Sequence, residues 1–167
     1  ADRAEGFQFS FEGHPNNTTR EHLERLYGLG FTRVSYGVQD YSPEVQKAIH
    51  RIQPFANVER VTLQAREIGY SSISHDLVFG LPFQKEEDMR YTIDCTNRLR
   101  PDRISFYSYA HVPWVKGTGQ RGFDENDLPT PDQKRHLYEI GKQQLLDNGY
   151  IEIGMDHFAL PSDEMYE

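Results

Sequence analysis

Three polar residues, Glu12, Gln39 and Asp76, each stand at or just beyond the end of an apolar, strand-like run. In folds that alternate parallel strands with helices, these strand ends converge on one face, where ligands bind. The three residues can therefore line one pocket although they lie far apart in the sequence. Gln39 can donate and accept hydrogen bonds, and the two carboxylates could bind ribose hydroxyls or an amino group. The alternative for each residue is that it caps the turn or helix that follows it.

Arg51 is a fourth candidate for this pocket. It stands shortly before Pro54 and could supply a fork of donors for a carboxylate or a phosphate. The alternative is an exposed helix-end arginine, which the helix dipole favours and which is the commoner case on spacing alone. His14 and His111 also follow strand-like runs and can face the pocket, although a histidine with a structural hydrogen bond is more common.

Two adjacent pairs, His75-Asp76 and Asp156-His157, have the residue types of a metal site or an acid-base pair. Neighbouring residues in a strand point to opposite faces, so neither pair can act jointly on a regular strand. We therefore expect no metal bound by the protein, and a metal-dependent hydrolase that uses these four residues is an alternative. Cys95 stands among apolar helix positions, which is typical of an inert core thiol.

Segments with helical periodicity alternate with the strand-like runs that carry the candidates. A glycine followed by an aromatic residue ends a helical segment at Gly30, Gly69 and Gly149, because glycine adopts the left-handed conformation without a clash. The Thr-x-x-Glu pattern from Thr18 to Glu21 predicts a capping box, and Asn57 is expected to cap another helix. Helices are expected over 19–29, 43–49, 57–68, 86–99 and 132–146, and strands over 7–12, 33–38, 73–79, 103–109 and 150–155.

This alternation predicts an α/β fold with a parallel sheet, either open or curved into a barrel. Residues 1–112 are expected to form the main strand-helix unit. Residues 113–130 contain several glycines and few apolar positions, which indicates a loop excursion. Residues 131–167 are expected to add a helix and a strand that pack on the main unit.

The composition excludes several classes of function. The chain has 167 residues, with 26 acidic and 18 basic side chains and a net charge of −8, and no Lys/Arg cluster is longer than a pair. A nucleic-acid partner and an anionic membrane surface are therefore disfavoured. No apolar run approaches the roughly 20 residues needed to span a bilayer, so a soluble, cytoplasmic protein is expected. The single cysteine excludes an internal disulfide.

Six short segments carry a resemblance to a known family. They are Phe11–Pro15, Arg33–Tyr41, Asp76–Pro82, Pro101–Ser105, Tyr109–Pro113 and Gly154–Ala159. Together they resemble the oxygen-independent coproporphyrinogen III oxidases, which are radical S-adenosylmethionine (SAM) enzymes of haem biosynthesis. The Gly-Val-Gln and Asp-Leu-x-x-Gly-Leu-Pro elements are shared with related radical enzymes and haem-handling paralogues. The Tyr-Ala-His-x-Pro and Gly-Met-Asp-His-Phe-Ala elements are more specific and favour the oxidase.

The resemblance implies a fold, an activity and a set of site residues. Residues 1–112 would be the C-terminal part of a radical SAM core, within an incomplete (β/α)6 barrel. The enzyme would decarboxylate two propionates of coproporphyrinogen III to vinyl groups, giving protoporphyrinogen IX, with SAM and a [4Fe-4S] cluster as cofactors. The resemblance assigns neither an electron donor nor an oligomeric state. By position, the SAM-binding residues would be Glu12, Gln39, Arg51 and Asp76, with Val78 and Ala110 as apolar neighbours of the adenosine.

The chain departs from the family in one large respect. The Cys-x3-Cys-x2-Cys loop that ligates the cluster is absent, and Cys95 cannot replace three thiolates. We therefore expect the chain to be an internal piece that supplies roughly the last four of six barrel strands and is inactive by itself. A haem-binding paralogue, acting as a haem chaperone rather than an oxidase, is the nearest alternative, and a fragment kept only for interaction is another.

Overall fold

The computed structural model describes residues 9–109, 125–154 and 156–162. Within these ranges the strands are β1 (Phe9–Gly13), β2 (Phe31–Gln39), β3 (Ser72–Phe79), β4 (Arg103–Ser108), β5 (Ile151–Gly154) and β6 (His157–Ala159). The helices are α1 (Arg20–Gly28), α2 (Pro43–Ala48), α3 (Phe55–Ile68), α4 (Glu86–Leu99) and α5 (Pro131–Asp147), with a short 3-10 turn η2 (Glu125–Asp127). The strands form one sheet in the order β1-β2-β3-β4-β6-β5.

The first four strands pair in parallel, and helices connect them along the chain. This confirms the expected α/β fold with a parallel sheet. The last two strands differ, because β5 and β6 form an antiparallel hairpin and β6 pairs antiparallel with β4. The few residues between them are too few for a parallel crossover, which needs a dozen or more residues. The strand expected over 150–155 corresponds to β5, and β6 is a further strand that was not predicted from the sequence.

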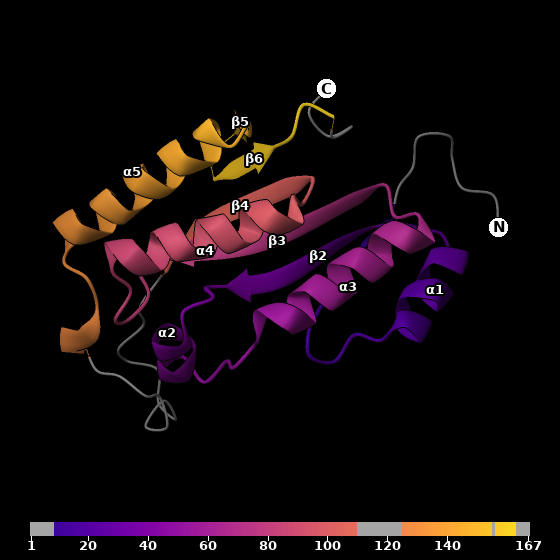
Figure 1. Ribbon diagram of the computed structural model, residues 1–167, viewed down its shortest axis with the longest axis horizontal. Helices are drawn as coiled ribbons and strands as arrows, with labels where there is room; N and C mark the ends of the chain where they lie inside the picture. Colours follow the sequence, from indigo (N-terminus) through magenta and orange to yellow (C-terminus); the bar gives the residue numbers. More distant parts are fainter. Residues whose placement is uncertain (1–8, 110–124, 155, 163–167) are drawn as a thin grey trace.

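The two faces of the sheet have different chemistry. Helices α1, α3 and α4 lie along one face (Figure 1), and apolar side chains such as Ile73 and Leu77 of β3 are buried on that side. Alternate residues of β3, Ser74 and Asp76, lie on the other face, because successive side chains of a strand point in opposite directions. On that polar face a hollow of about 350 Å³ is lined by serines, arginines and carboxylates from β1 to β4.

Two helix starts differ from the sequence-based expectation. The capping box of α1 is formed by Thr19 and His22, since each side chain bonds to the other's backbone N–H. Thr18 instead donates its hydroxyl to the carbonyl of His14. Helix α3 begins at Phe55 directly after Pro54, and Asn57 donates its side-chain amide to the side chain of Asn16. Neither Thr18 nor Asn57 is a helix cap, because the side chain of Thr18 bonds to the preceding loop and that of Asn57 bonds to a distant residue.

The three glycines that were expected to end helical segments have the left-handed backbone conformation that the sequence predicts. Gly30, Gly69 and Gly149 have φ angles of 110°, 116° and 97°, which a residue with a Cβ rarely adopts. Most of the expected loop excursion lies outside the described residues. The structure describes only its end, from residue 125 onward. In the described part of the chain, no helix combines the length and apolar character needed to cross a bilayer.

Candidate functional site

Four of the predicted cofactor residues and His14 lie in one pocket, at the carboxyl ends of β1 and β2 and beside the middle of β3. Its lining consists of Glu12, Gln39, Arg51 and Asp76 together with Gly13, His14 and Gly37, and its volume is about 330 Å³. Glu12 is near the end of β1, Gln39 is the last residue of β2, and Asp76 lies on β3. Arg51 reaches the pocket from the segment between α2 and α3. Residues far apart in the sequence thus meet where parallel strands end.

Gln39 is held in an unusual backbone conformation. Its φ angle is 69°, in the left-handed region that non-glycine residues seldom occupy. The backbone N–H of Asp40 donates to the carbonyl of Val38 at 2.9 Å, so Gln39 is the centre of a tight three-residue turn. The pairing of β2 with β3 also shifts register between Gly37 and Gln39. This local turn places Gln39 in the lining of the pocket.

Arg51 contacts the backbone of β2 directly. Its Nη2 donates to the carbonyl of Gly37 at 3.2 Å, and its Nε is buried with no hydrogen-bond partner among the described residues. A Cβ on Gly37 would lie 2.8 Å from Arg51 Nη2, so any larger residue would require the guanidinium to move from this position. The structure therefore excludes the exposed helix-end alternative, because this arginine is half-buried against the pocket.

Glu12 and Asp76 give the pocket two carboxylates. Ser35 donates its hydroxyl to Asp76 at 3.3 Å from the neighbouring strand. Burial raises the pKa of the Asp76 carboxyl, and the negative charge of Glu12 adds to this rise. Hydrogen bonds from Ser35 and Ser105 lower the pKa in turn. A cationic ligand would therefore stabilise the ionised carboxylate of Asp76 and offset the free-energy cost of burying its charge.

The two apolar candidates are placed differently. Val78 does not line this pocket and is buried with Val45 of α2 and with Leu81, which follows β3. Its carbonyl oxygen accepts a hydrogen bond from Gln84 at 3.0 Å. Ala110 lies outside the described residues, and so does His111. Their expected contacts with an adenosine remain predictions.

The two residues of the first His-Asp pair lie on opposite faces of the sheet, and in the second pair Asp156 has a positive φ of 66°. His75 is fully buried on the helix-covered face, where its Nε2 lies 3.0 Å from the hydroxyl of Thr62, whereas Asp76 points to the polar face. Burial lowers the pKa of His75 to about 3 and keeps its ring neutral. The Nδ1 of His157 lies 3.1 Å from the hydroxyl of Ser105. Among the described residues, no three His, Cys, Asp or Glu side chains gather as metal ligands.

Sequence reasoning missed the residues that support the pocket. Gly13 and Gly37 line it, and a glycine near the end of a strand is the signal that could have identified them. Behind the pocket, Asp40, Gln53 and Gln84 are buried and bonded to the strand ends. Their only sequence signal is that polar residues follow apolar strands, which is common in loops.

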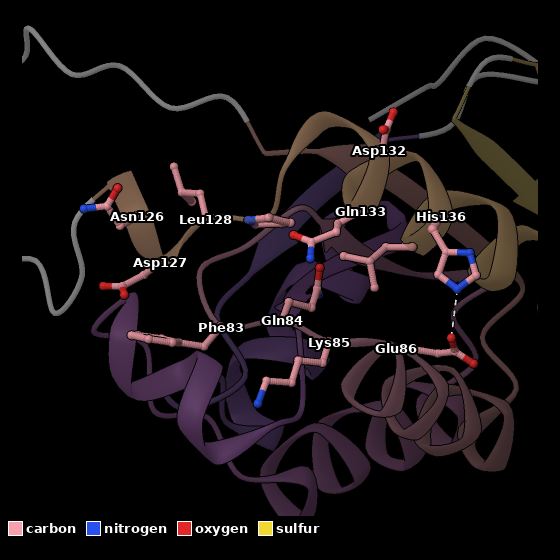
Figure 2. A pocket seen from close by; sticks show the side chains of 12 residues that line it. Phe83, Gln84, Lys85, Glu86, Asn126, Asp127, Leu128, Asp132, Gln133 and His136 are labelled. Carbon is pink, nitrogen blue, oxygen red and sulfur yellow. Dashed lines mark hydrogen bonds and ion pairs between the residues drawn. The ribbon is translucent and has the colours of Figure 1, made fainter.

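A larger hollow of about 590 Å³ lies between the segment after β3, the turn η2 and the first turns of α5 (Figure 2). His136 and Glu86 form an ion pair at 2.8 Å along its wall, and their hydrogen bond lowers the pKa of Glu86. None of the predicted site residues lines it. We therefore place the candidate site in the smaller pocket, which combines the convergent strand ends with three charged side chains.

Comparison with known proteins gives the family. Residues 3–96 match the model of the Radical SAM superfamily. The chain is 45% identical to an oxygen-independent coproporphyrinogen III oxidase of Helicobacter pylori strain J99 over 98% of this chain and 35% of the relative. It is 40% identical to the enzyme of that name from Escherichia coli K12 over 96% of this chain and 36% of the relative.

Solved structures agree with this result. The structure of the Escherichia coli coproporphyrinogen III oxidase, described as a radical SAM enzyme, superposes with a TM-score of 0.89 at 38% identity, over 95% of this chain and 36% of that one. A radical SAM methyltransferase from Kitasatospora setae shares the fold, with a TM-score of 0.59 at 19% identity over 65% of this chain and 21% of that one. The chain spans about a third of the length of the curated relatives that it matches. It belongs to the Radical SAM superfamily.

Proposed function

We propose that this chain is the SAM-binding part of an oxygen-independent coproporphyrinogen III oxidase. The whole enzyme would convert two propionates of coproporphyrinogen III to vinyl groups in haem biosynthesis. The observation that carries the proposal is the pocket at the strand ends, which gathers Glu12, Gln39, Arg51 and Asp76. Identities of 38% to 45% to oxidases of this name, over nearly the whole chain, support the choice of reaction.

The charges of the pocket complement those of SAM. SAM carries two cationic groups, a sulfonium and an ammonium, and one carboxylate. The pocket offers two carboxylates, Glu12 and Asp76, and one guanidinium, Arg51. The buried Nε of Arg51 has no hydrogen-bond partner within the described parts of the chain and is a donor that a ligand carboxylate can take up. The residues that are present therefore fit the cofactor.

Each side chain then has a binding role. Arg51 would hold the methionine carboxylate, while Glu12 and Asp76 would accept hydrogen bonds from the ribose hydroxyls and the amino group. The amide of Gln39 would fix the orientation of the cofactor from the end of β2. The bound SAM, with its cluster, supplies the radical chemistry of the reaction, and this chain orients it.

The cluster ligands are not in this chain. Its single cysteine, Cys95, is buried in α4, where burial raises the pKa of the thiol and keeps it protonated. In our proposal the three cysteines come from another part of the enzyme. Residues 1–112 would belong to the radical SAM core, and residues 131–167 would be an extension packed on it.

The proposal is tested on the full-length protein encoded by the gene, with its iron-sulfur cluster reconstituted under anaerobic conditions. SAM binding is measured by equilibrium dialysis for the wild type and for Arg51→Met. Loss of a charged hydrogen-bond donor should raise the dissociation constant about tenfold or more. The control is Arg25→Met, which removes an exposed arginine paired with Glu21 on α1 and should leave binding unchanged.

Turnover separates the oxidase from its nearest alternative. Incubation with coproporphyrinogen III, SAM and a reductant should yield protoporphyrinogen IX, which is followed by chromatography after oxidation to the porphyrin. Stoichiometric haem binding without decarboxylation would instead identify a haem-binding paralogue. A wild-type protein that does not bind SAM would refute the assignment of the pocket.

A further inference from the structure

A buried carboxylate lies directly behind the turn at Gln39. Asp40 is fully buried, and its Oδ1 accepts a hydrogen bond from the backbone N–H of Ser42 at 2.6 Å. Its Oδ2 accepts from the side-chain amide of Gln84 at 2.7 Å, and its backbone carbonyl accepts from the amide of Gln46 at 2.8 Å. Asp40 does not line the pocket. Any effect of Asp40 on the pocket must therefore act through the residues to which it is hydrogen-bonded.

Gln84 ties this carboxylate to the end of the neighbouring strand. Its Nε2 also donates to the carbonyl of Val78 at 3.0 Å. Its Oε1 accepts from the backbone N–H of Gly80 at 2.7 Å and from that of Leu81 at 3.3 Å. The side-chain amide of Gln84 thus donates to Asp40 and to the end of β3, and it accepts from the turn that follows β3. We call this pair of side chains the Asp40–Gln84 clamp.

The clamp holds a conformation that the backbone does not favour by itself. Gln39 has a positive φ and sits in a tight turn closed by the backbone N–H of Asp40. Such a conformation persists only where the surrounding structure over-determines it. The hydrogen bonds to the side chain and carbonyl of Asp40 fix the residue that closes this turn. The clamp therefore joins the end of β2, which carries Gln39, to the end of β3.

A second buried glutamine bonds to the same backbone carbonyl as Arg51. Gln53 is fully buried, and its Nε2 donates to the carbonyl of Gly37 at 2.7 Å and to that of Val38 at 3.3 Å. The Gly37 carbonyl is also the one to which Arg51 donates. Gln46 bonds to both Asp40 and Gln53, so the two supports form one network.

We propose that the Asp40–Gln84 clamp is a positioning device that presents Gln39 and, through the shared network, Arg51 to the cofactor. The inference rests on the proposed function, since it concerns the affinity for SAM. Neither clamp residue lines the cofactor pocket, so both are positioning residues rather than catalytic ones. Their hydrogen bonds set the geometry of two ligand-binding side chains before the ligand arrives, and such preorganisation increases affinity.

The test uses the full-length, cluster-loaded protein and the variant Asp40→Asn. The amide at position 40 then faces the amide donor of Gln84, and the clamp loses its central bond. SAM itself is the probe, with equilibrium dialysis at a temperature where circular dichroism shows every variant folded. The dissociation constant and the KM for SAM should rise about tenfold, because a buried donor is left without a partner.

Two further variants separate positioning from general stability. Thr62→Val removes a buried hydrogen bond to His75 on the opposite face of the sheet and should leave SAM affinity unchanged while lowering the melting temperature. In the double variant D40N/Q84E the amide at position 40 can donate to the carboxylate at position 84, but that carboxylate cannot replace the bond from Gln84 to the carbonyl of Val78. The double variant should recover only part of the lost affinity.

The outcomes are distinct. Wild-type affinity in Asp40→Asn or an equal loss in Thr62→Val would each overturn the clamp, while the proposed function would stand if Arg51→Met still weakens binding. Failure of the wild type to bind SAM would refute the proposed function itself. Recovery in the double variant together with normal affinity in Thr62→Val would support the clamp.

Discussion

At the scale of single residues, the pocket depends on how closely a side chain can approach the backbone. Arg51 reaches the carbonyl of Gly37 because nothing projects from that glycine. The φ angle of Gly37 is not positive, so an alanine there would meet no backbone strain and only a steric conflict. A Cβ added at position 37 would also lie 3.4 Å from Nε2 of Gln39. One methyl group would therefore displace the guanidinium of Arg51 and make an ordinary contact with the amide of Gln39.

We expect Gly37→Ala to weaken SAM binding about tenfold or more in the full-length protein, because the guanidinium must move away from its carbonyl partner. Equilibrium dialysis measures the change. The matched control is Gly28→Ala at the end of α1, where an added Cβ meets nothing within 4 Å. Equal affinities in the two variants would show that the contact between Arg51 and Gly37 does not matter for the cofactor.

His75 makes folding sensitive to acid. Its pKa is lowered to about 3 in the fold, mainly by burial, from an ordinary value of 6.5. The unfolded chain therefore binds one more proton than the folded protein between these two values. The contribution of this neutral histidine is fully present above pH 6.5 and is lost as the pH falls below it, by up to about 1.4 kcal/mol per pH unit.

Urea unfolding of the chain at pH 7 and pH 5 tests this dependence. Other groups titrate in the same interval: burial raises the pKa of Asp40 to about 6, which acts in the opposite direction. The comparison is therefore made with His75→Gln, which keeps a polar side chain without a titrating ring. The wild type should lose more stability on acidification than the variant, and parallel losses would contradict the role of His75.

At the scale of elements, helix α5 depends on a small residue where it crosses the core. Gly141 is buried in the middle of α5, where it lies against Phe106 of β4 and Met89 of α4. A Cβ at this position would lie 2.6 Å from the ring of Phe106 and 3.2 Å from the sulfur of Met89. Glycine, usually a weak helix residue, is here what allows the helix to pack closely.

Gly141→Ala should therefore destabilise the fold by about 1–3 kcal/mol through overpacking, although alanine favours the helix by about 1 kcal/mol relative to glycine. The free energy of unfolding in urea gives the net effect. A variant as stable as the wild type would mean that α5 can shift away from the sheet without cost.

At the scale of the whole molecule, the sheet has one apolar face under the helices and one polar face. Parallel sheets that are covered on both sides normally carry apolar residues on both faces. A polar face on four parallel strands suits the inside of a barrel that holds a charged ligand. This arrangement agrees with our proposal that the chain is part of a radical SAM barrel.

We predict that the isolated chain assembles no [4Fe-4S] cluster and shows no turnover, because it contains one buried thiol where three thiolates are needed. Anaerobic reconstitution with iron and sulfide, followed by visible absorbance and iron analysis, measures cluster formation. A broad absorbance band together with cleavage of SAM by the isolated chain would contradict the prediction.

The sequence by itself predicted most of the elements and several of the polar side chains that line the pocket. Amphipathic periodicity and the glycines that end helical segments are local signals, so they locate helices and strands before any tertiary contact forms. The glycines are Gly30, Gly69 and Gly149. Convergence of parallel strand ends is a rule of topology, which is why Glu12 and Asp76 could be expected in one pocket. Their role toward SAM stays a proposal.

Other features were decided only by tertiary contacts. Asn57 is not a cap, because its side chain bonds to Asn16 far away in the sequence, and β6 pairs antiparallel with β4 as well as with β5. Asp40 and Gln84 are 44 positions apart, yet they share a buried hydrogen bond. The sequence determined the local elements and the chemistry available at the strand ends. The tertiary structure decided which polar groups were buried together, because the cost of leaving a buried group unpaired depends on neighbours that only the fold brings near.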